Sequence, residues 1–286
     1  MTDFLGHALP GVYFFFLGVY YAIQASLALL RGQQFLTPPL PPRDKRPKGW
    51  LQKLQNGGLV KVVFSIGGFL GAFFYPLGSN RLVFIDWKDP ERPFLNHISW
   101  HHGTMYVLLL INGLVDIVSQ CCLARQQMKL ERAAFAFAIQ GTILLFIFHI
   151  QGRNALQVRG HILLLIPLIL IALILLSELW FPDDPVFWIS KAWMFLTLGS
   201  WFPHLGSILY LPVTGQPWRA DKHEDVMFLP IFFSWHLILD ALLIAGIYGL
   251  CSFRHHRYLS HQGAKGAGYQ LCSTDISTEE VKTLMV

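Results

Sequence analysis

Seven long apolar stretches constrain the fold of this chain more than any other feature of its sequence. A helix needs about 20 mostly apolar residues to cross a hydrocarbon core about 30 Å thick. The stretches that approach this length are residues 11–30, 59–75, 100–123, 133–150, 161–179, 186–211 and 226–250. The sequence therefore predicts an all-α integral membrane protein, a bundle of about seven transmembrane helices.

The content and placement of charged residues favour the same class. Only 14% of the 286 residues are charged, whereas a soluble domain carries about 25%. The net charge of +5 would suit nucleic acid, but the basic residues lie mostly in loops between apolar runs and form no continuous stripe. We therefore expect the lipid bilayer as the partner and exclude nucleic acid; the sequence indicates no particular protein partner.

Polarity along the chain predicts two regions and one orientation. Residues 1–251 are expected to form the membrane domain, and the polar residues 252–286 a flexible tail. The first loop (residues 31–58), the third loop (124–132) and the tail together hold 13 Lys and Arg, whereas the loops on the opposite side hold 7. By the positive-inside rule, the N-terminus is then outside or luminal and the C-terminus cytosolic.

The distribution of the 12 histidines is the pattern most informative about function. With this topology all of them except His255, His256 and His261 lie in outer loops or in the outer parts of helices. Imidazole titrates near physiological pH and is a common ligand of zinc and copper. We expect a shared polar cluster that binds a ligand or, as metal ligands, holds zinc or copper; its residues are His101, His102, His149 and His236.

Three further residues join the predicted binding set. Asn112 and Asp116 follow His101 at close to whole turns of a helix, so one helix face should carry all three. Glu224 lies beside His223, just before the last apolar stretch. For His223, as for His97 and His161, capping of a helix or contact with lipid headgroups is the alternative to a role in the cluster.

Two acidic residues deep in apolar stretches need an explanation of their own. A charge near the bilayer centre costs at least about 2.5–3.5 kcal/mol, so Asp116 and Asp240 should be paired, protonated or next to water. Lys61 and Lys191 are the candidate partners, and we favour structural ion pairs over a proton path. Gly67-x-x-x-Gly71 predicts close packing of the second helix against a neighbour.

Short motifs along the whole membrane region resemble the transmembrane protein 45 family, which includes the transmembrane epididymal proteins. The motifs are Gly6-His7-Ala8-Leu9-Pro10-Gly11, Trp100-His101-His102, His149 before Gly152-Arg153, Gly199-Ser200-Trp201-Phe202, His223-Glu224 and Trp235-His236. The resemblance implies a multi-pass protein of cell-surface or secretory-pathway membranes, without an established biochemical activity. The chain departs from the family pattern at Gln55, Gly57, Gln151, His204 and Asp240.

Three functions remain open at this point. The first is a receptor-like or scaffolding protein whose outer histidines form a pH-responsive polar network. The second is a metal-dependent membrane enzyme acting on a lipid, in which bound zinc would supply an acidified water as nucleophile. The third is a proton- or metal-linked transporter whose route is lined by the outer histidines, Asp116 and Asp240. The sequence indicates no catalytic residue.

Overall fold

A computed structural model describes residues 4–42, 57–213, 215–216 and 218–283 of the chain. Within these ranges the chain forms seven α-helices and no strand, which confirms the predicted all-helical class. The helices are α1 (Phe4–Leu30), α3 (Gly57–Phe74), α4 (His97–Ile117), α5 (Met128–His149), α6 (Ala155–Ser177), α7 (Pro185–Tyr210) and α8 (His223–Thr283). Gln55 and the Lys and Arg residues from Arg43 to Lys53, which entered the predicted orientation, lie outside the described residues.

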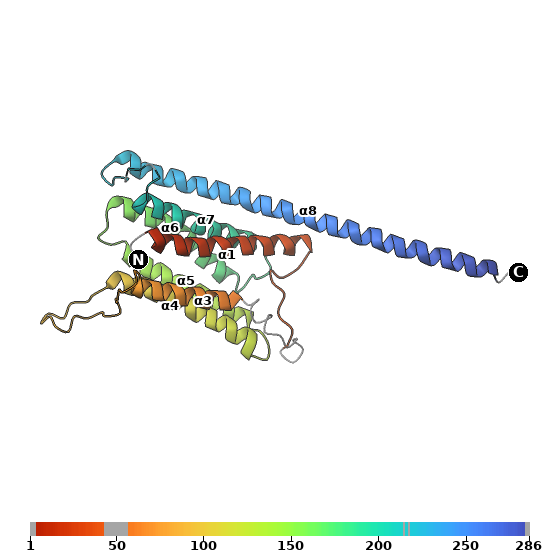
Figure 1. Cartoon of the computed structure of the whole chain (residues 1–286), viewed down its shortest axis with the longest axis horizontal. Helices are drawn as coiled ribbons and strands as arrows, with labels where there is room; N and C mark the ends of the chain where they lie inside the picture. The colour runs from red at the N-terminus through yellow and green to blue at the C-terminus, as the bar shows by residue number, and fades with distance from the viewer. Residues whose placement is uncertain (1–3, 43–56, 214, 217, 284–286) are drawn as a thin grey trace.

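The helices run side by side along one axis, and α8 extends far beyond the others (Figure 1). At 61 residues α8 is much longer than the 25 residues predicted for the last apolar stretch, because the helix continues past residue 252. Residues 252–283 are therefore helical where we predicted a polar tail. The division of the chain at this position, and the flexibility and location of the tail, stay predictions.

Six of the described helices are long and apolar enough to cross a membrane, and α7 is the exception. Most of α7 between Lys191 and Trp201 is nevertheless buried in the bundle. Its Trp193 Nε1 donates to the carbonyl of Leu237 on α8 at 2.9 Å, and Trp201 Nε1 donates to that of Gly160 on α6 at 3.2 Å. Over this stretch α7 therefore faces other helices rather than lipid.

Glycines bring α1 and α7 into the closest contact of the bundle. A Cβ atom on Gly199 of α7 would collide with the backbone of Phe15, and one on Gly18 of α1 would lie 2.7 Å from the backbone nitrogen of Leu196. Small residues permit this approach, which stabilises helix pairs in membranes by close packing. The packing predicted at Gly67 is wrong, because nothing lies within 4 Å of a Cβ there; Gly68 is the residue that meets a neighbour, Tyr106.

Two buried ion pairs hold helices together inside the bundle. Lys61 Nζ lies 2.7 Å from Asp116 Oδ2, so one of the two candidate partners pairs with Asp116. Lys191, the other candidate, pairs with neither Asp116 nor Asp240: its Nζ lies 2.5 and 2.8 Å from the two carboxylate oxygens of Glu178. Glu178 caps the end of α6 beside the start of α7, so it reaches Lys191, whereas Asp240 bonds to Ser200.

Candidate functional site: a histidine cluster and an apolar cavity

Five histidines from four helices meet at one end of the bundle, and we call them the histidine cluster. They are His7 of α1, His101 and His102 of α4, His149 of α5 and His161 of α6. The ring of His149 is central, with centroid distances of 5.8 Å to His101, 5.0 Å to His102 and 5.8 Å to His161. His7 joins through His161, at 5.5 Å. The helices alternate in direction, which is why these helix ends come together (Figure 1).

Hydrogen bonds determine which nitrogens of two of these rings can accept. The Nδ1 of His161 lies 2.7 Å from the carbonyl oxygen of Gln157, which can only accept, so Nδ1 carries the hydrogen. Arg153, in the loop after α5, donates through Nε to the carbonyl of His149 at 3.1 Å, and its Nη2 lies 3.4 Å from His149 Nε2. Because a guanidinium always donates, His149 Nε2 accepts. Arg153 thus adds a permanent positive charge at the edge of the cluster.

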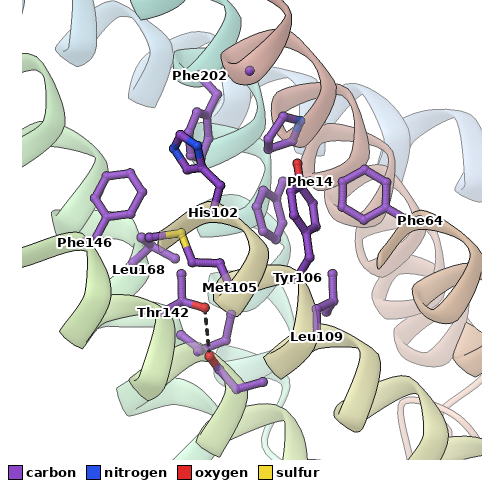
Figure 2. A pocket seen from close by; sticks show the side chains of 14 residues that line it. Phe14, Phe64, His102, Met105, Tyr106, Leu109, Thr142, Phe146, Leu168 and Phe202 are labelled. Atoms are coloured by element: carbon purple, nitrogen blue, oxygen red, sulfur yellow. Dashed lines mark hydrogen bonds between the residues drawn. The ribbon is translucent and has the colours of Figure 1, made fainter. Parts of the chain in front are cut away.

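An apolar cavity of about 90 Å³ lies directly next to the histidine cluster. Figure 2 shows His102 at one end of it, near Phe202 and Phe146, with Thr142 and Leu109 towards the other end. The cavity extends along α4 from His102 to Leu109, which is about 10 Å of helix. Its lining residues are Gly6, Pro10, Phe14, Phe64, His102, Met105, Tyr106, Leu109, Ala138, Ile139, Thr142, Phe146, Leu168 and Phe202.

One buried polar atom in the lining of this cavity has no hydrogen-bond partner among the described residues. Thr142 Oγ1 donates to the carbonyl of Ala138 at 2.9 Å and is therefore satisfied within its own helix. The Nδ1 atom of His102 is buried and has no hydrogen-bond partner among the described residues. A buried polar group without a partner costs about 1–3 kcal/mol. A ligand or a water that bonds to His102 would recover this energy.

A second, more open hollow lies beside the cluster. It has a volume of about 410 Å³ and lies between the loop 75–96 and the start of α4. His101, which contacts His149 in the cluster, also lines this hollow, together with Phe84, Phe94 and Trp100. Phe94 and Trp87 of the loop are 77% and 69% exposed. Exposed aromatic side chains at helix ends are typical of the membrane–water interface.

His236 lies apart from the histidine cluster, in a separate group on α7 and α8. Its Nε2 is 2.8 Å from Nδ1 of His204, and its Nδ1 is 2.8 Å from Oγ of Ser200. Ser200 Oγ in turn donates to Asp240 Oδ2 at 2.8 Å. We call these four residues the Asp240 chain. The indole of Trp201 packs edge-on against both of its imidazoles, at 5.4 and 5.5 Å.

The other residues of the predicted binding set are scattered. Asn112 is fully buried on α4, and its side-chain amide has no hydrogen-bond partner among the described residues. Asp116, one turn further along α4, is engaged with Lys61. Glu224 is exposed in the first turn of α8. His101 is at the opposite end of α4, about 22 Å from Asp116, so a common helix face does not make these residues one site.

The structure unites three of the four predicted metal ligands, His101, His102 and His149, but not His236. Across the described part of the chain, no group of three or more His, Cys, Asp or Glu side chains has an arrangement that could hold a metal ion. Binding of zinc or copper stays a prediction.

Sequence reasoning missed several residues that contribute to these sites. His7 and His161 belong to the cluster, whereas the sequence places His7 only among the outer histidines and leaves capping or lipid contact open for His161. Ser200 connects His236 to Asp240. The motifs that contain His7 and Ser200 had been noted for the resemblance alone, and a search for polar residues within these motifs could have found both.

Comparisons with known proteins agree with the resemblance seen in the motifs. A family model described as "Family of unknown function (DUF716)" matches residues 128–249. Transmembrane epididymal protein 1 of Rattus norvegicus is 33% identical over 283 residues, covering 95% of this chain and 92% of the relative. Transmembrane epididymal protein 1A of Mus musculus is 34% identical, covering 96% and 90%, and the Homo sapiens protein is 33% identical, covering 82% and 86%.

Proposed function

Because the chain belongs to the transmembrane epididymal protein family, a family of multi-pass membrane proteins, we propose a function that uses the interior of the bilayer. The protein binds a single-chain amphiphile with an acidic head group, such as a fatty acid. The apolar chain of this ligand occupies the cavity, and the head group lies in the histidine cluster. This makes the protein receptor-like, in the sense of the first of the three functions left open by the sequence.

The unpartnered Nδ1 of His102 is the observation that carries this proposal. It is a buried polar atom at the end of a cavity whose lining is otherwise almost entirely apolar. Ligand sites in proteins typically combine an apolar wall with a few polar groups that orient the ligand. An amphiphile satisfies both parts at once, whereas a purely apolar molecule would leave His102 unbonded.

The charge beside the cluster favours an acidic head group over a neutral one. Arg153 contacts His149, and His149 in turn packs against His102, so a positive charge lies two side chains from the cavity. A carboxylate or phosphate there would receive charge-assisted hydrogen bonds, which are roughly twice as strong as neutral ones. The small volume of the cavity suits a linear chain rather than a fused ring system. The hollow lined by His101 supplies a route from the interface.

We also propose the orientation and location that the sequence predicts. With the N-terminus outside or luminal, the histidine cluster lies on the outer side of a secretory-pathway or cell-surface membrane. The ligand would then enter from the outer leaflet. A pH response of the cluster, the metal-dependent enzyme and the transporter all stay predictions.

Photo-crosslinking tests this function directly. Detergent-purified protein is incubated with a diazirine-labelled long-chain fatty acid, irradiated and digested, and the modified peptides are identified by mass spectrometry. Labelling is expected on α4 at Met105 and Tyr106, which line the cavity. Replacing Thr142→Phe should fill the cavity and abolish this labelling, and His102→Ala should reduce it. His223→Ala removes an exposed histidine at the start of α8 that does not line the cavity and serves as the matched control.

Two comparisons make the result decisive. The methyl ester of the same fatty acid keeps the chain but has no charge, so it should label the cavity much more weakly than the acid. The thermal melting of each variant shows whether it is folded. Equal labelling of wild type, Thr142→Phe and His102→Ala, all folded, would show that the ligand binds elsewhere and would overturn the proposal.

A further inference from the structure

A continuous row of hydrogen bonds leads from a half-buried histidine to a carboxyl group inside the membrane domain. Three contacts of 2.8 Å each join His204 to His236, His236 to Ser200 and Ser200 to Asp240. His204 lies about 9 Å from the end of α7, and Asp240 is one turn deeper than His236 along α8. The row crosses the contact between α7 and α8 and lies outside the proposed amphiphile site.

The hydrogens of this row have one consistent arrangement when Asp240 is ionised. A carboxylate only accepts, so the hydroxyl of Ser200 donates to Asp240. The Oγ of Ser200 must then accept from Nδ1–H of His236, which leaves Nε2 of His236 as the acceptor. That Nε2 accepts from Nδ1–H of His204. Each contact holds one hydrogen, and Nε2 of His204 keeps a free lone pair.

We propose that the Asp240 chain is a proton relay, which supplies Asp240 with a proton from the end of the bundle where His204 lies. A proton binds to Nε2 of His204, and the Nδ1 proton of His204 passes to Nε2 of His236. The Nδ1 proton of His236 passes to Ser200, and the hydroxyl proton of Ser200 passes to Asp240. Asp240 is then a neutral carboxylic acid, and both imidazoles are neutral in the other tautomer. One proton has entered, and release reverses the same steps.

The burial of Asp240 explains why this carboxyl group needs a source of protons. Asp240 is only 4% exposed, and no Lys or Arg side chain forms an ion pair with it in the described part of the chain. An uncompensated charge inside a membrane helix is expensive, so a neutral form must be reachable. The Asp240 chain joins this carboxyl to a half-buried ring without the movement of any helix.

Among the described residues, no other titratable group of the packed helices is hydrogen-bonded to the row. Helix α8 packs against α1, α6 and α7. Between Phe4 and Leu30, α1 has no Lys, Arg, Asp or Glu, and its His7 belongs to the histidine cluster. On α6, His161 is also in the cluster and Arg159 is exposed. The Lys191 of α7 is held by Glu178. The indole of Trp201 packs against both His204 and His236, and the ring of Phe232 packs against His204.

Infrared difference spectroscopy on protein in lipid nanodiscs tests the relay. Lowering the pH should produce the carbonyl stretching band of a protonated carboxylic acid, and Asp240→Asn should remove this band. After a rapid pH jump, Ser200→Ala should slow the appearance of the band by about 100-fold, because a positioned proton-transfer group is lost. Ser200→Thr keeps a hydroxyl and should restore the wild-type rate. His204→Gln, which cannot pass a proton between two nitrogens, should be as slow as Ser200→Ala.

The final level of the band separates a relay from a structural role. A relay changes the rate at which Asp240 gains its proton and leaves a band in Ser200→Ala at equilibrium. Equal rates in wild type, Ser200→Ala and His204→Gln would overturn the proposal. If Asp240→Asn kept the carbonyl band, the proposal would be overturned as well, because another carboxyl group would then be the one that titrates. Thermal melting confirms that each variant compared is folded.

Discussion

The two groups of histidines in this protein use the same side chain in opposite ways. In the histidine cluster, the buried Nδ1 of His102 has no partner within the described residues, and an apolar cavity adjoins it. In the Asp240 chain, both ring nitrogens of His236 are hydrogen-bonded, and the row of hydrogen bonds ends at the buried carboxyl group of Asp240. A buried nitrogen without a partner beside a cavity can bond to a ligand, whereas a row of hydrogen bonds can pass a proton from one end to the other. The hydrogen-bond partners of the histidines, and not the residue type, therefore distinguish the two proposed roles.

The boundary between the two groups consists of two adjacent aromatic residues of α7, and replacing them should have the largest effect. Trp201 packs on His204 and His236, while Phe202 packs on His7 and Phe146 beside the cavity. Either substitution by alanine should lower the free energy of unfolding by about 3–5 kcal/mol. Trp201→Ala should also disturb proton uptake at Asp240, and Phe202→Ala the labelling by the fatty acid. If either variant impaired both functions equally, the two groups would be one site.

Replacing one histidine from each group should show the difference in bonding as a difference in stability. His236→Ala removes the hydrogen-bond partner of His204 Nδ1 and one of the partners of Ser200 Oγ, so it should destabilise the protein by about 1–3 kcal/mol. His102→Ala removes a nitrogen that has no bond to lose, so its cost should be distinctly smaller. Chemical denaturation in detergent of both variants gives the comparison. A larger loss for His102→Ala would mean that its ring is bonded in the free protein.

Removing the charge of Arg153 beside the histidine cluster should weaken ligand binding and leave proton uptake at Asp240 unchanged. Arg153→Gln removes a charge-assisted hydrogen bond worth about 1.5 kcal/mol, so the affinity for a fatty acid should fall about tenfold. Proton uptake at Asp240 should be unchanged, since Arg153 contacts only the cluster. Competition binding and infrared titration on the same preparation measure both quantities. Arg159→Gln, an exposed arginine one turn into α6, is the matched control.

The side of the membrane on which both groups lie can be tested with no expected loss of stability. A short epitope at the N-terminus should be stained in intact cells, and one at the C-terminus only after permeabilisation, provided that the protein reaches the cell surface. The reverse pattern would leave the comparison intact, but ligand and protons would then reach both groups from the cytosol.

Much of the architecture followed from hydrophobicity alone. The predicted starts and ends of most helices lie within six residues of those in the structure, because apolar length sets where a chain can cross a bilayer. Helix α1 begins at Phe4 and not at Gly11, since Pro10 lies inside the helix instead of preceding it. The ion pair of Lys61 and Asp116 was also predictable, because each needs a partner and both lie at a similar depth.

The sequence by itself determined the class, the family, the seven helices and the gathering of histidine-bearing helix ends, because these depend on composition, length and direction along the chain. Only the tertiary structure decided that His236 joins Asp240 and not His149, that Glu178 takes Lys191, and that a cavity ends at His102. Such choices depend on how each helix is rotated about its axis and which neighbour it faces. Close approaches such as that of Gly199 to Phe15 set this rotation, and they involve residues far apart in the chain.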